Sequence, residues 1–179
     1  MSNPDSTVDT APCRLAEVDE DTEMMEVLSI PAGSSFDLAA QYAVYSCPIN
    51  YSFRPSLYIT LRKEGAVMDR LFLRKNTYRL PASLEMISGC PDIPNEDKKQ
   101  ILAYLKAAIG RNMIIEFDPA KPDYGNDIKV VVMDRDRVVW LPYQAEMERA
   151  SVARVYYTLR ELLDPRTAPS ARPASQENE

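Results

Sequence analysis

Cations and aromatic side chains are interleaved in one stretch of the sequence, residues 54–79. This stretch holds seven cations and two acids, a local net charge of +5 in a chain of net charge −6. Its cations are Arg54, Arg62, Lys63, Arg70, Arg74, Lys75 and Arg79. Guanidinium groups pair with phosphates and aromatic faces stack on bases, so the pattern indicates binding of a single nucleic-acid strand, a modified base or a nucleotide. Cations on exposed strands also prevent edge-to-edge aggregation, and this alternative stays open.

The same stretch predicts two β-strands joined by a short loop. Apolar and polar side chains alternate from Leu57 to Arg62 and again from Arg70 to Arg74, the period of a half-buried strand. Gly65 lies between them and can supply the positive φ of a hairpin loop. A five-residue loop would place Ile59 opposite Leu71 and bring the cations and rings onto one outer face. The side chains expected on that face are Tyr58, Arg62, Arg70, Phe72 and Arg74.

Several other chemistries are excluded by composition or spacing. The chain has no histidine, which removes Ser-His-Asp and Cys-His catalysis and imidazole ligation of zinc. Its three cysteines are far apart and cannot supply four thiolates. Each of the five glycines is isolated, so neither GxGxxG nor a phosphate-binding P-loop is present. We therefore expect a protein without catalytic activity, cofactor or metal.

Two groups of acidic residues suggest metal chemistry, but each has a simpler interpretation. Pro91, Asp92, Glu96 and Lys98 have the letters of a metal-dependent PD-(D/E)xK nuclease. Glu96 and Lys98 are two positions apart, so their side chains point in different directions around a helix. A helix N-terminus capped by Asn95 accounts for the acidic residues without a metal. A second group lacks the spacing of a calcium-binding EF-hand loop. Its members are Glu116, Asp118, Asp123 and Asp127.

The remaining pattern predicts an α+β fold: a mainly antiparallel curved sheet or small open β-barrel with one main helix at about 95–110. Residues 95–110 carry one apolar stripe with acids in the first turn. A helical turn is expected from 36, and Thr158 to Glu161 has the pattern of a capping box. The further strands are expected at 27–30, 42–46, 113–117, 128–133, 137–141 and 155–157, with a tight turn at 134–136.

The segments RPSLYITLRKEGAVMDRLFLRK (54–75) and RVYYTLRELL (154–163), with a helix and strands between them, resemble small PUA-like β-barrel modules. Members of that family read RNA or modified bases. The resemblance covers about residues 42–163 in outline, and it implies a groove lined by Tyr58, Arg62, Arg70 and Trp140. The candidate binding residues are thus Tyr58, Arg62, Arg70, Phe72, Arg74 and Trp140.

A single globular domain is expected over residues 27–163, with disordered segments on both sides. Residues 1–26 contain eight acids and one base, and residues 164–179 are rich in Pro, Ala and Ser. The acidic leader could also fold over the basic hairpin and compete with anions. No membrane span or signal peptide is evident, so a cytoplasmic location is expected. The surplus of acids leaves a second function open, that of an interaction or inhibitor protein for a basic protein partner.

Overall fold

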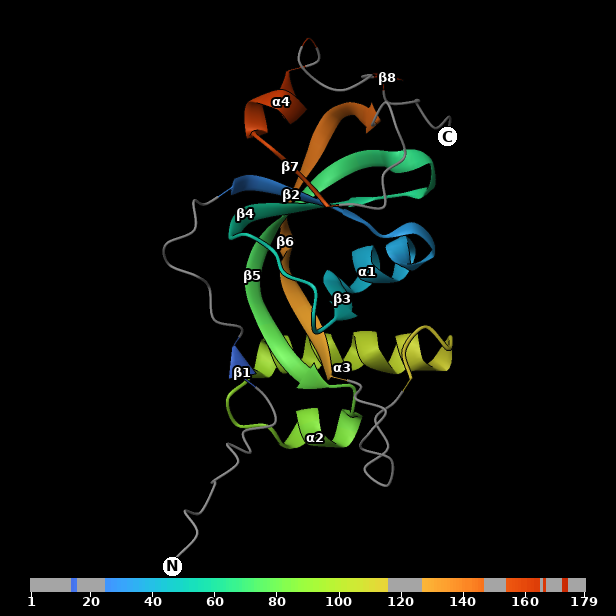
Figure 1. The fold of residues 1–179 in the computed structure, drawn as a ribbon, viewed down its shortest axis with the longest axis vertical. Helices are drawn as coiled ribbons and strands as arrows, with labels where there is room; N and C mark the ends of the chain where they lie inside the picture. The colour runs from blue at the N-terminus through green and yellow to red at the C-terminus, as the bar shows by residue number, and fades with distance from the viewer. Residues whose placement is uncertain are drawn as a thin grey trace, which may run out of the picture.

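The computed structural model describes residues 14–15, 25–115, 127–146, 154–164, 166 and 172–173. Most of the predicted leader and tail lies outside this part of the chain, so the prediction that these segments are disordered stays untested. The described residues form an α+β fold around one curved, open sheet (Figure 1). The predicted fold class is therefore confirmed. None of the described helices is long and apolar enough to cross a membrane.

Among the described residues, six strands follow one another across the sheet. Their order is β3 (Val44–Pro48), β6 (Asp127–Glu146), β5 (Val67–Pro81), β4 (Ser56–Arg62), β2 (Met25–Pro31) and β7 (Val155–Tyr157). Neighbours pair in antiparallel fashion except β2 and β4, which are parallel. The short strands β1 (Arg14–Leu15) and β8 (Arg172–Pro173) pair with β5 and β6. The helices are α1 (Phe36–Tyr42), α2 (Leu84–Gly89), α3 (Asn95–Gly110) and α4 (Leu159–Leu163).

Strands β5 and β6 form a long bent ribbon that connects the two ends of the molecule in Figure 1. The two strands predicted at 128–133 and 137–141 are in fact one strand, so that prediction is wrong. Its residues 134–137 lie opposite Leu73 alone, because Met133 pairs with Arg74 and Val138 already pairs with Phe72. Asp134 Oδ1 accepts hydrogen bonds from the backbone N–H groups of Asp136 and Arg137, at 2.9 and 3.1 Å. The expected turn is thus a bulge that bends a continuous strand.

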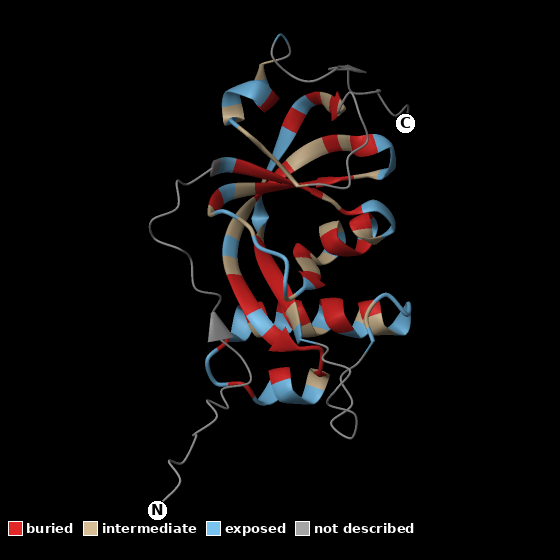
Figure 2. Cartoon of the chain, viewed as in Figure 1, coloured by how far each residue is buried: buried red, intermediate tan, exposed pale blue. Residues whose placement is uncertain are grey.

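Helix α3 packs on one face of the lower part of this ribbon. Its bounds are those predicted, although Pro94 rather than Asn95 precedes the first helical residue. Figure 2 shows buried and exposed residues alternating along the helix, as expected for an amphipathic stripe. The core residues that meet here are Val44, Tyr78, Leu80, Ile101, Tyr104, Leu105, Ala108, Val130 and Val132. After α3 the chain turns at Asn112, with φ of 55°, and residues 113–115 are not the strand predicted there.

The hairpin between β4 and β5 has the predicted loop but not the predicted register. Gly65 has a φ of 79°, and the backbone N–H of Lys63 donates to the carbonyl of Val67. Further along, Ile59 pairs with Phe72 instead of Leu71. The register has therefore shifted by one residue between the loop and the body of the hairpin. Such a shift reverses the face on which a side chain lies.

Candidate anion-binding site

Two of the predicted binding residues are buried inside the molecule. Arg62 is 1% exposed, and burial lowers the pKa of its guanidinium while the nearby Tyr157 opposes this shift. Phe72 is buried among the apolar side chains between α1 and the sheet. The prediction that both residues share an outer face with Tyr58 is therefore wrong. The register shift is the physical reason for the position of Phe72, since Phe72 now lies opposite the buried Ile59.

Arg70 and Trp140 lie together, as a cross-strand pair between β5 and β6. The Arg70 guanidinium carbon is 4.1 Å from the centre of the Trp140 ring, which is 62% exposed. The same guanidinium donates to both carboxylate oxygens of Asp69 at 2.8 Å, and Lys63 Nζ lies 2.7 Å from one of them. Burial would raise the pKa of Asp69, but hydrogen bonds from Arg70 and Lys63 hold it below its ordinary value. The charge of Arg70 is therefore largely neutralised within the protein.

Other members of the basic stretch divide into paired and unpaired cations. Lys75 Nζ lies 3.0 Å from Asp97 Oδ1. In the described part of the chain, no carboxylate lies within ion-pair distance of Arg54, Arg74 or Arg79. The predicted hairpin thus retains its unbalanced charge mainly at its far end, on β5.

Four cations form the cationic cluster: Arg74 and Arg79 of β5, Lys129 of β6, and Arg154, which immediately precedes β7. Arg79 and Lys129 are direct cross-strand partners. Lys129 is only 7% exposed, and burial lowers its pKa. The nearby Arg79, Arg154 and Arg74 lower that pKa further, while Cys47 opposes them. Like charges placed opposite one another destabilise a sheet, so this arrangement costs folding free energy.

Neutral groups of residues 49–55, between β3 and β4, orient two of these cations. Lys129 Nζ donates to the carbonyl of Tyr51, and Arg154 Nη1 donates to the carbonyl of Ser52. The Arg154 guanidinium carbon is 4.4 Å from the centre of the Tyr51 ring and 5.3 Å from that of Phe53. Lys129 Nζ lies 5.3 Å from the Phe53 ring centre. Carbonyls and rings position the charges without cancelling them.

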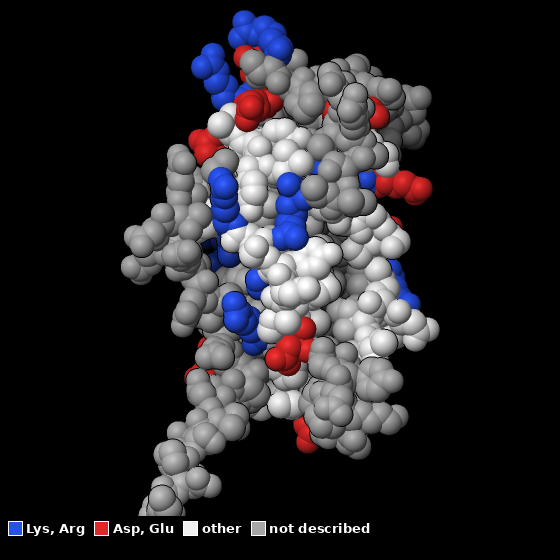
Figure 3. All heavy atoms as spheres, in the orientation of Figure 1, with Lys and Arg blue, Asp and Glu red and all other residues white. Residues whose placement is uncertain are grey.

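Arg74 is held by a hydroxyl group rather than by an acid. Its Nη2 and Nε donate to Thr77 Oγ1 at 2.8 and 3.2 Å. Burial lowers the pKa of Arg74, and the nearby Tyr156 opposes this shift. Figure 3 shows Lys and Arg side chains following one another down the middle of the face that it presents. This arrangement can bind an anion, because cations from neighbouring strands lie together and their hydrogen-bond partners among the described residues are hydroxyl and carbonyl oxygens rather than carboxylates.

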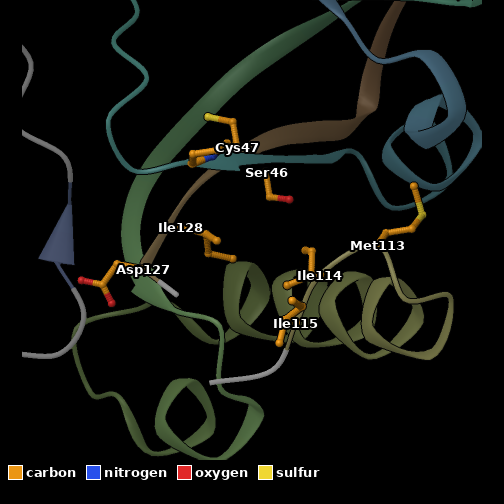
Figure 4. Close-up of a pocket in the computed structure, with 8 residues that line it drawn as sticks. Ser46, Cys47, Met113, Ile114, Ile115, Asp127 and Ile128 are labelled. Carbon is orange, nitrogen blue, oxygen red and sulfur yellow. The ribbon is translucent and has the colours of Figure 1, made fainter. Parts of the chain in front are cut away.

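Cys47 belongs to the floor of the cationic cluster and pairs with Lys129 across β3 and β6. Burial raises the pKa of the thiol to about 11, although Lys129 and Arg154 lower it. The residue is therefore a neutral thiol near pH 7 and not an activated nucleophile. In Figure 4 its sulfur points to the opposite side of β3 from Ser46.

A pocket of about 310 Å³ lies on the other side of β3, next to the end of α3 (Figure 4). Its lining is mostly apolar, and no cation contributes to it. The lining residues are Ser46, Cys47, Pro48, Met113, Ile114, Ile115, Asp127 and Ile128. Ser46 and Ile128 line the pocket and Cys47 lies beside both features, but none of the four cations of the cationic cluster belongs to the pocket lining.

The predicted acidic groups do not form a metal site in the part of the chain that the structure describes. There, no three His, Cys, Asp or Glu side chains gather closely enough to hold an ion. Asp97 is instead buried, where its Oδ2 accepts hydrogen bonds of 2.7 Å from Asn76 and from Tyr78. Of the second acidic group, Glu116, Asp118 and Asp123 lie outside the described residues.

Comparison of the chain with protein-family models, with curated proteins and with solved structures gave no match. The resemblance to PUA-like modules therefore stays a prediction.

Of the residues in this site, the sequence pattern indicated Arg74 as a binding residue but not Arg79, Lys129, Arg154 or the ring of Phe53. Residues 74, 129 and 154 are far apart in the chain and come together only through the β3–β6–β5 pairing and β7. One signal was available for Lys129. It is a single cation inside the otherwise apolar run IKVVVM (128–133), and a buried lysine usually has a specific role or partner.

Proposed function

We propose that the protein binds the phosphate groups of a single nucleic-acid strand or a nucleotide at the cationic cluster. The single observation that carries the proposal is the cross-strand pair Arg79–Lys129, with Arg74 and Arg154 beside it and with no described carboxylate balancing these charges. A protein of net charge −6 has a large supply of acids for such pairing. Clustered cations that are left unbalanced are best explained by an anion that comes from outside.

The surrounding groups suit a nucleotide-containing ligand better than a simple inorganic anion. Tyr51 is 41% exposed beside Arg154, and its ring offers a face on which a base can stack. The cations supply the phosphate contacts, which give affinity without reading the base. Binding in this form needs no nucleophile or metal, so we propose a binding module and not an enzyme.

The site differs from the hairpin face expected from the sequence, although both include Arg74. Arg70 already pairs with Asp69, so a phosphate would have to compete with a carboxylate held at 2.8 Å. Arg79 has no such competitor among the described residues, and its side chain is exposed. We therefore assign the phosphate contacts to the far end of β5.

Replacing two arginines of the cluster tests the proposal. The Arg74→Gln/Arg79→Gln variant should bind a fluorescent oligothymidylate of about ten nucleotides at least tenfold more weakly than the wild type, measured by anisotropy. The slope of log K against log[salt], between roughly 50 and 200 mM, should flatten by about 0.7 for each phosphate that the variant no longer neutralises.

A matched control carries the same change of charge elsewhere. Lys99 and Lys106 are exposed on α3, and the Lys99→Gln/Lys106→Gln variant should keep both the affinity and the slope. Circular dichroism verifies that both variants are folded. Unchanged binding in the cluster variant, or an equal decrease in the control, would overturn the proposal.

A further inference from the structure

The cluster is spread along β5, and this spacing bears on the kind of phosphate ligand. Resting on the proposed function, we infer that the ligand is a polymer: an extended single strand of nucleic acid whose successive phosphates lie along β5. One phosphate meets Arg79 and Lys129, and the next meets Arg74.

The pairing of the strands places the two phosphate positions in neighbouring rows of the sheet. The first row contains Arg79, Lys129 and Cys47, which are direct partners across β5, β6 and β3. The next row on the same face starts at Thr77, two residues earlier on β5. Because Arg74 donates to Thr77 Oγ1 at 2.8 Å, its guanidinium is fixed at this second row.

The distance between these rows matches a repeating ligand. Two residues of a β-strand span about 6.6 Å, at about 3.3 Å per residue. Successive phosphates of an extended single strand are separated by a similar distance, whereas the phosphates of a nucleoside triphosphate share bridging oxygens and lie closer together. Compact phosphate chains are usually bound by consecutive backbone N–H groups of one loop. In the cationic cluster the donors are side chains from separate strands.

The position of Lys129 favours a single strand over a duplex. Lys129 is almost buried and its ammonium group lies beside the Phe53 ring, so a phosphate must come close to the strands to reach it. A flexible single strand can bend toward Lys129 and stack an unpaired base on Tyr51. A duplex keeps its bases paired, and its stiff backbone cannot enter in this way.

Ligands of different length and form test the inference. The probes are thymidine monophosphate, ATP, oligothymidylate of about ten nucleotides, and a duplex of the same length. We expect the oligothymidylate to bind at least tenfold more tightly than ATP and the duplex, with a salt slope of about −1.4 or steeper, which corresponds to two or more phosphates. Single Arg74→Gln and Arg79→Gln variants should each flatten the slope by about 0.7, and the double variant by both amounts.

The outcomes separate the two proposals. Binding of ATP or the monophosphate as tightly as the oligothymidylate, or tighter binding of the duplex, would overturn the inference and leave the proposed function standing. If either Arg74→Gln or Arg79→Gln alone abolished the salt dependence of oligothymidylate binding, the inference of two separate phosphate positions would also be wrong. The absence of binding to every probe would overturn the proposed function itself.

Discussion

At the scale of single residues, the pair Arg79–Lys129 carries a cost in stability, which we expect the proposed ligand to offset when it binds. Burial and the nearby Arg79, Arg154 and Arg74 lower the pKa of Lys129. The folded protein therefore disfavours the lysine charge relative to the unfolded chain. This cost is present below the folded pKa and disappears as the pH rises above the unfolded value, about 10.4. The repulsion is therefore present in full at any pH below the folded pKa.

Replacing Arg79 should accordingly stabilise the protein while it weakens binding. We expect Arg79→Gln to raise the free energy of unfolding by about 0.5 kcal/mol at low salt, the usual size of a cross-strand charge effect. The gain should shrink in about 1 M salt, where surface charges are screened. Urea unfolding of both proteins, with Lys99→Gln as the control, measures this difference. A variant less stable than the wild type at low salt would show that the pair is not repulsive.

At the scale of elements, a buried carboxylate attaches α3 to β5. Asp97 of the first helical turn accepts hydrogen bonds from Asn76 and Tyr78, both at 2.7 Å, and its other oxygen lies 3.0 Å from Lys75 Nζ. Burial would raise the pKa of Asp97, but these three partners together hold it below the ordinary value. Such a carboxylate stabilises the fold above its unfolded pKa, about 3.9, and this contribution is lost as the pH falls through the lower folded pKa.

Asp97→Asn should therefore destabilise the protein by about 2 kcal/mol near pH 7, because buried donors lose a charged acceptor. The difference from the wild type should narrow as the pH falls below about 4. Urea unfolding at several pH values provides the measurement. Glu96→Gln is the matched control: Glu96 is exposed and lies 3.9 Å from Lys75, so its replacement should change stability by less than about 0.5 kcal/mol. Equal effects of the two changes would contradict the role assigned to Asp97.

At the scale of the whole molecule, the cationic cluster is a local positive region in a protein whose net charge is −6. Residues 17–23 contain five of the acids. The described chain just before them pairs close to the cluster, because Leu15 pairs with Tyr78, next to Arg79. Acids in this part of the sequence should repel a nucleic acid or compete with it for the cations.

Neutralising these acids should tighten binding. We expect Asp19→Asn/Glu20→Gln/Asp21→Asn to lower the Kd for oligothymidylate several-fold at about 50 mM salt and to have little effect at about 1 M salt. The control, Glu85→Gln/Asp92→Asn/Glu96→Gln, removes the same charge in α2, before α3 and at its start. Equal tightening in both variants would indicate an effect of net charge alone, whereas weaker binding in the first would contradict the expected competition.

Elements whose signals are local could be predicted from the amino-acid sequence. Alternation located β4, an apolar stripe with acids in its first turn located α3, and the Thr158–Glu161 capping box located α4. Each depends on residues within a few positions of one another, so no knowledge of the fold is needed.

Which cations share a face depends on how the folded chain packs. A register shift of one residue turned Phe72 into the core, and a bulge at Asp134 joined two expected strands into one. The packing also placed Arg62 inside and brought Lys129 and Arg154 to Arg74 and Arg79. The physical reason is that strand register and long-range pairing depend on the whole set of packed side chains, which the periodicity of a single segment does not contain.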